Sequence, residues 1–255
     1  MTGLLIFACG LIGLIVGSFA NVCVHRLPKG KSVVLPGSHC PACGKAIAWF
    51  DNIPLLSFLL LNGRCRHCQS RISLRYPLLE LLMGFSWVAL AWHYGFSIDL
   101  LMALTLVSML WILTLIDLET GLLPNALTFP GIFIGCLFGL WLGSFSESVI
   151  GVVAGYGFFW VVAKAFLFVT GREGMGYGDF KLLAMLGAFF GWKALPFIVF
   201  AASLAGAIIG SIYLLISDRH ARAEIPFGPY LALAAVLWLL WGPEWVHLYL
   251  NMMIG

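Results

Sequence analysis

The sequence predicts an all-α polytopic membrane protein with about eight transmembrane helices, one of them short or broken, and a small polar loop domain. Three features lead to this prediction, and the first two concern composition. The 255 residues are 62% hydrophobic and only 10% charged, and the mean hydropathy of +1.01 lies far outside the range of soluble domains. The third feature is the arrangement of the apolar residues in separate long runs, because crossing the bilayer core takes about 20 mostly apolar residues.

The first apolar run, 3–25, is predicted to remain as a helix. No Lys or Arg precedes it, and the positive cluster of Arg26, Lys29 and Lys31 follows it, which is the wrong order for a cleaved signal peptide. Further runs of sufficient length are found along the rest of the chain, and a shorter apolar piece makes an eighth. These runs lie at 76–94, 99–116, 124–143, 147–169, 194–217 and 227–243, and the shorter piece at 180–192.

The long polar segment 26–75 is rich in Lys and Arg and holds the single acid Asp51. By the positive-inside rule this loop is cytoplasmic. Counting crossings from it places the amino terminus outside and the turns at 117–124 and 170–180 inside. If the short apolar piece also crosses, the carboxyl terminus lies outside. The segment 217–224, with its two arginines, also falls inside, in agreement with its charge. The net charge of +3 gives no indication of a nucleic-acid partner.

Two matched cysteine motifs lie in this loop, "CPACGKAI" and "CRHCQSRI", and both follow the pattern CxxCxxxI. Two such knuckles can direct four thiolates at one centre, which is the closed tetrahedral arrangement that structural zinc prefers. The predicted ligands are Cys40, Cys43, Cys65 and Cys68. Because the loop has few apolar residues for a core, a bound metal would fold it.

Disulfides, or a redox pair of cysteines, are the alternatives to zinc. A cytoplasmic location disfavours structural disulfides, and redox pairs do not usually occur as two matched knuckles. His39 and His67 abut the cysteines and could substitute for one of them as ligands. The remaining cysteines, Cys9, Cys23 and Cys136, lie in apolar runs and are interpreted as small core residues.

Carboxylates that border membrane segments are costly and are therefore candidates for function. Asp117 follows the apolar run 99–116, near the negative end of that helix, where a carboxylate is disfavoured. The alternative is an interfacial residue that reaches for water. Asp179 precedes the short apolar piece, and its simplest interpretation is a helix N-cap.

The short piece after Asp179 spans only about 21 Å of helix, less than the bilayer core of about 30 Å. Gly174, Gly176 and Gly178 supply permissive backbone before it, and broken segments at membrane depth occur where they are buried in protein or line a watery cavity. The predicted topology places Asp117 and Asp179 at the same cytoplasmic edge. Two carboxylates that meet there would share a proton, with one acting as base on a water and the other as acid, as in peptide hydrolysis.

Glu80 lies about one turn inside the second predicted helix, and we expect an interfacial or packing role for it, such as pairing with Arg75. Other hydrolytic or phosphate-binding motifs are not found in the sequence: it contains no HExxH, no GxSxG and no GxxxxGK.

The segments around the two acids and the cysteine loop are recognisable when they are taken together. "GYGD" at 176–179 is a GxGD motif, and together with "DLETGLLPNALT" at 117–128 it closely resembles the bacterial type 4 prepilin peptidases, also called leader peptidases. The resemblance covers nearly the whole chain and keeps the order of the family's motifs. The other matching segments are "GSFANVCVHRLP", the twin CxxC loop, "RYPLLELLMG" and "PFGPYLAL".

This resemblance implies an eight-helix aspartic protease of the bacterial inner membrane. Its substrates would be type IV prepilins and the pseudopilins of type II secretion, each with a basic leader and an apolar helix embedded in membrane lipid, cleaved at the cytoplasmic face. Members with the long cysteine loop typically also methylate the new amino terminus with S-adenosylmethionine. Carried over by position, the catalytic acids are Asp117 and Asp179, the motif glycines are Gly176 and Gly178, and the loop cysteines match the family's own.

One departure is visible, because this chain reads "LPN" with Asn125 where the family often reads LPD. No second carboxylate is therefore present there, and Asn125 and Glu80 are retained as auxiliary candidates. The domains expected are a first transmembrane helix (1–25), the cytoplasmic zinc-binding loop associated with methyl transfer (26–75), and a membrane domain (76–255) with the peptidase core at about 99–230.

An ion-coupled transporter with intramembrane carboxylates is the main alternative function, and a zinc-organised scaffold with a membrane anchor is another. No inverted repeat is evident between the halves, and the acids gather on one side, so a peptidase is favoured over a transporter. About eight segments are more than an anchor needs.

Overall fold

The computed structural model describes residues 2–172, 174–216 and 226–254, and they form an all-helical chain without a β-strand. The predicted all-α class is confirmed. Arg219 and Arg222, which entered the topology prediction, lie outside the described residues. The long helices are α1 (Thr2–Arg26), α3 (Arg75–Tyr94), α4 (Ile98–Thr120), α5 (Asn125–Trp141), α6 (Phe145–Thr170), α7 (Tyr177–Phe190), α8 (Leu195–Ile216) and α9 (Gly228–Ile254). Short elements are α2 (Leu56–Leu60) and the 3-10 turns η1 (Leu27–Lys29), η2 (Trp49–Asn52) and η3 (Trp192–Ala194).

Four stretches of the described helices are long and apolar enough to cross a membrane. They are Thr2–Lys29, Ile98–Thr120, Phe145–Thr170 and Trp192–Ile212. Asn125–Trp141 and Gly228–Gly242 are apolar but shorter. The prediction of a polytopic membrane protein is therefore supported by helices in both halves of the chain.

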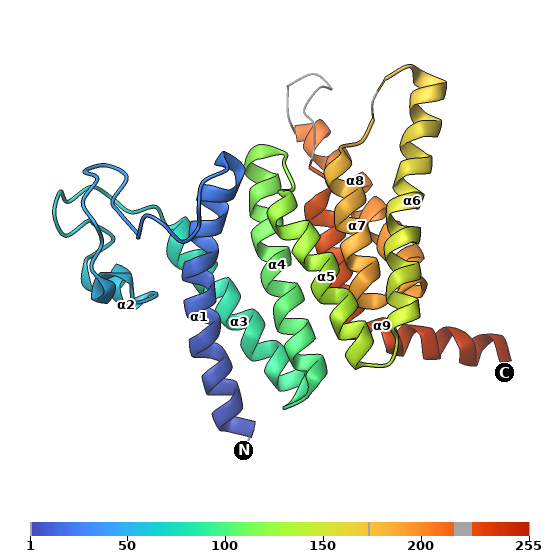
Figure 1. The fold of residues 1–255 in the computed structure, drawn as a ribbon, viewed down its shortest axis with the longest axis horizontal. Helices are drawn as coiled ribbons and strands as arrows, with labels where there is room; N and C mark the ends of the chain where they lie inside the picture. The colour runs from blue at the N-terminus through green and yellow to red at the C-terminus, as the bar shows by residue number, and fades with distance from the viewer. Residues whose placement is uncertain (1, 173, 217–225, 255) are drawn as a thin grey trace. The chain divides into compact units, whose positions relative to one another are not determined.

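Two compact units divide the chain at Ile112 and Leu113. In the amino-terminal unit, α1 lies along α3 (Figure 1), and small residues allow the two backbones to approach closely. A Cβ on Gly17 would lie 2.7 Å from the Cα of Glu80, and one on Gly13 would lie 3.0 Å from the Cα of Gly84. Side chains larger than hydrogen at these positions would force the helices apart.

The long loop between α1 and α3 is tied to the end of α1 by Arg26, whose side chain is buried. Its guanidinium donates to the carbonyl oxygens of Ser32 (3.1 Å) and Gly37 (3.2 Å). On the other side, Asn21 donates to the carbonyl of Tyr76 (3.1 Å) and links α1 to the start of α3. Hydrogen bonds therefore hold the start of the loop to α1, and hold the start of α3, where the loop ends, to α1 as well.

In the carboxy-terminal unit, α7 is the most deeply buried of the described helices, with nearly every side chain from Phe180 to Phe189 buried. It packs against α5 and α6, which lie beside it in Figure 1. Glycines on both neighbours allow this approach: a Cβ on Gly135 would lie 2.8 Å from the Cβ of Ala188, and one on Gly155 would lie 2.6 Å from the carbonyl oxygen of Leu183. The short predicted piece is thus the centre of its unit.

Several helix ends differ from the predicted runs, most clearly in α4, α7 and α9. Helix α4 extends to Thr120, whereas its apolar run ended at 116. The short helix begins at Tyr177 and ends at Phe190, whereas the apolar run had indicated 180–192. The last helix, predicted at 227–243, extends from Gly228 to Ile254. Counting apolar residues stops at the Gly242-Pro243 pair and at the polar residues beyond it, although a helix can continue through both with a local adjustment.

Candidate active site and metal centre

The four loop cysteines form one compact cluster. The sulfur atoms of Cys40, Cys43, Cys65 and Cys68 all lie within 4.8 Å of one another, and the Sγ atoms of Cys40 and Cys68 are 3.8 Å apart. Four thiolates around one zinc ion at about 2.3 Å would have sulfur-to-sulfur distances of about 3.8 Å. The sulfur positions therefore fit a tetrahedral metal ion.

Each half of this cluster is built by the same local turn. The N–H of Cys40 donates to the carbonyl of Lys45 and the N–H of Cys65 donates to that of Ser70, both at 2.9 Å. In both turns the residue after the second cysteine has a positive φ, +69° at Gly44 and +58° at Gln69. The repeated sequence pattern therefore folds into a repeated backbone, which brings the two cysteine pairs to a common centre.

At Cys40 and Cys68 the turns favour the thiolate, the form in which cysteine binds metal, whereas burial and the neighbouring Cys68 and Cys40 raise the pKa of the Cys43 thiol to about 11. The N–H groups of Cys43 and Ala42 point at the Cys40 sulfur and lower the pKa of its thiol to about 6. The Ser70 hydroxyl lies 3.1 Å from the sulfur of Cys68 and lowers the pKa of that thiol. The donor set and its surroundings thus fit a structural zinc ion.

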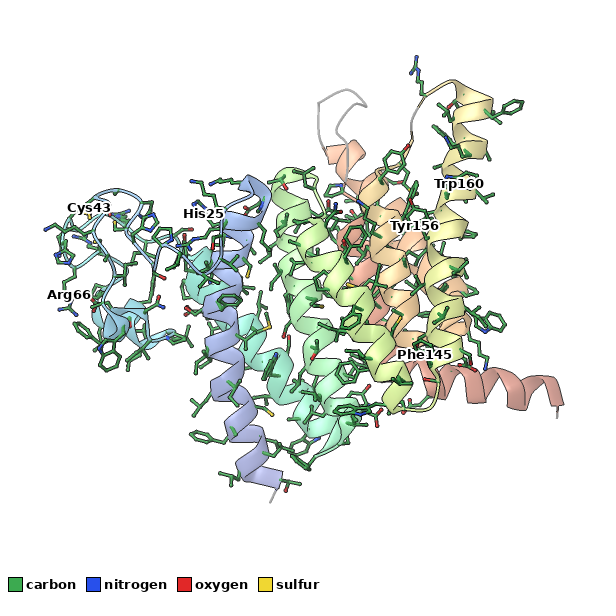
Figure 2. The ribbon with its side chains drawn as sticks, in the orientation of Figure 1. His25, Cys43, Arg66, Phe145, Tyr156 and Trp160 are labelled. Atoms are coloured by element: carbon green, nitrogen blue, oxygen red, sulfur yellow. The ribbon has the colours of Figure 1, made fainter. Side chains whose placement is uncertain are left out.

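His39 and His67, the alternative ligands, are not members of this group of metal-binding side chains. His39 Nδ1 instead lies 3.1 Å from the carbonyl oxygen of Gly37. The loop is braced separately by Arg66, which makes two hydrogen bonds to the Asp51 carboxylate at 2.7 and 2.6 Å and lowers the pKa of Asp51. Figure 2 shows Cys43 and Arg66 in this part of the loop.

The first candidate acid, Asp117, is buried in the last turn of α4. The backbone N–H of Gly228, the first residue of α9, donates to Asp117 Oδ2 at 3.0 Å. A Cβ on Gly228 would lie 2.5 Å from this oxygen, so only glycine allows the backbone to approach the carboxylate. Asp117 is therefore held by protein and does not reach out to water as an exposed interfacial residue would.

The second candidate acid, Asp179, lies in the first turn of α7 and is partly buried. The helix starts at Tyr177 with Gly176 as its N-cap, and no side chain caps it. The N-cap interpretation of Asp179 is therefore wrong, because the helix begins earlier than the apolar run suggested. The carboxylate is instead close enough to Asp117 for the two charges to interact.

Leu123 contacts the backbone beside each of the two acids, in α7 and in α9. A Cβ on Gly178 would lie 2.9 Å from the Cβ of Leu123, and one on Gly228 would lie 3.5 Å from its Cδ2. Gly178 immediately precedes Asp179, and Gly228 binds Asp117. The side chain of Leu123 thus packs against two backbone segments, one next to Asp179 and one that binds Asp117.

Asn125 is the first residue of α5, and its Oδ1 accepts a hydrogen bond from Lys181 Nζ at 2.7 Å. It does not itself contribute a carboxylate to the pair. Gly176 has open space around its α-carbon, whereas Gly178 does not. Of the two motif glycines, Gly178 is therefore the one required by packing.

Glu80 belongs to the amino-terminal unit, whereas Asp117 and Asp179 belong to the carboxy-terminal unit. It is buried, and its Oε2 accepts a hydrogen bond from the N–H of Leu55 at 2.8 Å. Leu55 is the centre of a tight γ-turn, with φ +59° and a 2.6 Å hydrogen bond from Leu56 N–H to the Pro54 carbonyl. Glu80 thus anchors a strained turn of the cysteine loop onto α3.

Sequence reasoning from single residues did not find Gly228, Leu123 or Lys181. Gly228 lies within "PFGPYLAL", a segment whose only signal in the sequence is its resemblance to the prepilin peptidases. A glycine at the start of a helix, a leucine in a short connection and a lysine next to a motif carry no chemical signal by themselves. Their roles depend on contacts between distant segments.

Two family models match the chain in succession. The Bacterial Peptidase A24 N-terminal domain matches residues 11–94, and the Type IV leader peptidase family matches residues 104–211. The first match holds the four cysteines and Glu80, and the second holds Asp117 and Asp179. No solved structure matches the chain.

Several relatives named "Prepilin leader peptidase/N-methyltransferase" align with almost the whole chain. The protein of Pseudomonas aeruginosa is 43% identical and that of Aeromonas hydrophila 44% identical, each over 94% of this chain and 92% of the relative. The protein of Burkholderia pseudomallei strain K96243 is 38% identical over 94% of this chain and 87% of the relative.

Proposed function

The chain belongs to the type IV leader peptidase family, and from this premise we propose that it cleaves prepilin leaders and N-methylates the new amino terminus, with Asp117 and Asp179 as its peptidase acids. Relatives named for both activities share its full set of regions, from the cysteine loop to the last helices. A bifunctional membrane enzyme is therefore favoured over an ion-coupled transporter.

The observation that carries the peptidase assignment is the placement of the two acids: Leu123 packs against Gly178, the residue before Asp179, and also against Gly228, which binds Asp117. In a poorly hydrated site, two such groups do not both ionise easily, and they hold one proton between them. The hydrogen bond from the Gly228 N–H fixes the orientation of Asp117. This leaves the pair set for general acid and base catalysis.

In the proposed reaction, the ionised member of the pair takes a proton from a water molecule as the water oxygen bonds to the scissile carbonyl carbon. The protonated member gives its proton to the carbonyl oxygen. The tetrahedral intermediate then collapses: the carboxyl group that took the water proton gives it to the leaving amine as the C–N bond breaks, and the carboxylate that had given up its proton takes one from a hydroxyl of the intermediate as the carbonyl forms again. Both carboxyl groups return to their starting state, so no external co-reactant beyond water is needed.

The glycine-rich approach to α7 gives the substrate access in this proposal. A prepilin has a basic leader followed by an apolar helix, and its cleavage site lies where these two parts meet at the membrane boundary. The helix would enter laterally from the bilayer, and the segment with Gly174, Gly176 and Gly178 would adjust as it docks. Crosslinking of a bound leader at the periplasmic face would contradict this arrangement.

We assign a structural zinc ion to Cys40, Cys43, Cys65 and Cys68, because their sulfur atoms are arranged for it. When bound, the ion would close and fold the loop. S-adenosylmethionine would be the methyl donor, by analogy with the activity in the names of the relatives. The domain organisation proposed is a first helix at 1–25, the zinc-binding loop at 26–75, and the membrane domain at 76–255, with the peptidase core at about 99–230.

The membrane topology proposed is a multi-pass inner-membrane protein with about eight crossings. The basic residues of the cysteine loop support a cytoplasmic position for that loop and for the two acids. The amino terminus would then be periplasmic. Prepilins, and the pseudopilins of type II secretion, are the proposed substrates.

A leader-cleavage assay on the purified full-length protein tests the proposal, with wild type, Asp117→Asn and Asp179→Asn. We expect each change to lower cleavage by about a thousandfold or more, while the protein still inserts and folds. Asp99→Asn, at the opposite end of α4, is the matched control and should cleave normally. Full activity of a well-folded Asp179→Asn protein would refute the assignment.

Methyl transfer requires a separate measurement, with a labelled donor and a substrate that has already been cleaved. Both Asp→Asn variants should retain this activity, because the proposed acids act only on the peptide bond. Loss of both activities in a folded variant would show that the two reactions share these residues.

A further inference from the structure

We propose that the hydrogen bond between Lys181 and Asn125 is a latch that positions the aspartate pair for cleavage. This inference rests on the proposed peptidase function and concerns two residues that do not themselves touch the reacting bond. In this role both are positioning residues.

The latch joins the beginnings of two helices. Lys181 lies two residues after Asp179 in α7, and Asn125 is the first residue of α5. The Lys181 ammonium donates to Asn125 Oδ1 at 2.7 Å and also lies 5.7 Å from the centre of the Phe129 ring, one turn further along α5. The lysine is thus held by two groups on the same helix, through a hydrogen bond and a cation–π contact.

The start of α7 makes few other hydrogen bonds. Gly176 is its N-cap and no side chain caps it, and the N–H of Asp179 bonds locally to the Gly176 carbonyl at 3.2 Å. Among the described residues, the latch is the hydrogen bond that ties the first two turns of α7 to another helix. The latch therefore acts on the orientation of Asp179 together with the packing of the next residue, Phe180. The buried ring of Phe180 lies beside Tyr156 and Phe159 of α6.

The other side of the latch controls Leu123, two residues before Asn125. The connection from α4 to α5 is fixed at its beginning by the N–H of Gly121, which donates to the Asp117 carbonyl at 2.8 Å. It is fixed at its end by the latch. Between these points the Leu123 side chain lies against Gly178 and Gly228. Release of Asn125 would therefore loosen these contacts beside the two acids, and also the helix that carries Asp179.

The latch needs an oxygen acceptor at position 125 but no negative charge. The carbonyl oxygen of Asn125 accepts the hydrogen bond, and a carboxylate of the same length would accept it too. Asn125→Asp therefore preserves the contact, whereas Asn125→Leu removes the acceptor at similar volume.

Cleavage kinetics of the full-length protein with a prepilin substrate test the latch. We expect Lys181→Met and Asn125→Leu each to lower kcat by about tenfold, because small displacements of reacting groups are costly, and to change KM by less than about twofold. The double variant should be no slower than the slower single variant, since both remove the same contact. Asn125→Asp should stay within about threefold of wild type.

Lys193→Met is the matched control, because Lys193 makes an equally short exposed bond at the other end of α7, 2.7 Å to Glu147. It should leave kcat and KM unchanged. The latch is contradicted if Lys181→Met behaves like this control, if KM rises while kcat is kept, or if a folded Asn125→Asp protein is as slow as Asn125→Leu. Asp179→Asn in the same assay separates the two proposals: if it cleaves like wild type, the aspartate pair itself is wrong, whereas an inactive Asp179→Asn beside a fully active Lys181→Met removes only the latch.

Discussion

The cysteine cluster and the aspartate pair are assembled in opposite ways. Each cysteine knuckle closes on itself through hydrogen bonds between residues a few positions apart, and the two knuckles repeat one backbone turn. The aspartates come from helices α4 and α7, and their surroundings are completed by Gly228 from α9 and by Leu123. The first site is local and repeated, whereas the second exists only when distant helices are packed.

This difference affects how each site can fail. A site that closes locally depends on its ligands and on the metal, so substitutions elsewhere in the chain should matter little to it unless they contact the loop, as Glu80 does. A site made by packing depends on close contacts that have no chemistry of their own. The two sites should therefore respond differently to metal removal and to substitutions in the residues that surround them.

Loss of the metal should have the largest effect, confined to the loop. Chelation, or Cys40→Ser together with Cys65→Ser, removes a binding free energy of about 10 kcal/mol that is also folding free energy. We expect about one zinc ion per chain before treatment, and rapid proteolysis within residues 26–75 afterwards. Cys136→Ser, outside the cluster, is the control. If the metal-free protein loses leader cleavage as completely as Asp179→Asn does, the two regions are not independent.

Gly228→Ala should impair the aspartate site without any change in its acids. The added Cβ would lie 2.5 Å from Asp117 Oδ2, so the backbone must move and the carboxylate must turn. We expect kcat for leader cleavage to fall by about a hundredfold, with metal content unchanged. Gly157→Ala in α6, where the Cβ meets nothing within 4 Å, should cleave like wild type. Normal activity of Gly228→Ala would show that this contact does not position Asp117.

Glu80→Ala should destabilise the loop by about 2 kcal/mol, because the N–H of Leu55 loses its acceptor in a strained turn. Glu80→Gln keeps an acceptor oxygen and should lose less. The zinc release temperature of purified protein measures this effect. An equal loss for both variants would mean that the charge of Glu80 matters and not its hydrogen bond to Leu55.

Gly44→Ala should have the smallest effect, a loss of about 1 kcal/mol in the stability of the first knuckle. No atom obstructs the added Cβ, so the cost comes only from φ of +69° at this position. Gly37→Ala in the same loop also has open space and does not require a positive φ, and it should be neutral. Metal affinity measured by competition with a chelator distinguishes the two.

The sequence predicted the helical class and pointed to both groups of candidate residues, for different reasons. Apolar runs gave the long helices because their lengths match a membrane, and the cysteine spacing gave the metal cluster because its geometry is local. The two acids were paired by topology, which placed them on one side of the bilayer. Each residue by itself had an ordinary interpretation, and for Asp179 that interpretation, the N-cap, is wrong because α7 begins at Tyr177.

The contacts that surround the acids could not be predicted from the sequence. The hydrogen bond from Gly228 to Asp117, the packing of Leu123 and the bond from Lys181 to Asn125 all join segments whose relative position depends on helix packing. The anchoring of Leu55 by Glu80 is of the same kind, since it requires the loop to return to α3. A γ-turn centred on leucine has no sequence signature, because the residue is unfavourable there.

The glycine contacts of α7 also bear on how the protein is made. A helix of 14 residues is too short to be retained by lipid alone, since about 20 apolar residues are needed. Its backbone meets α6 at Gly151 and Gly155, and α6 is synthesised before it. We therefore expect α7 to enter the membrane only against helices already inserted. Ribosome-bound chains that end soon after Phe190 would still lack Gly228, so the surroundings of Asp117 would be completed only when α9 is in place.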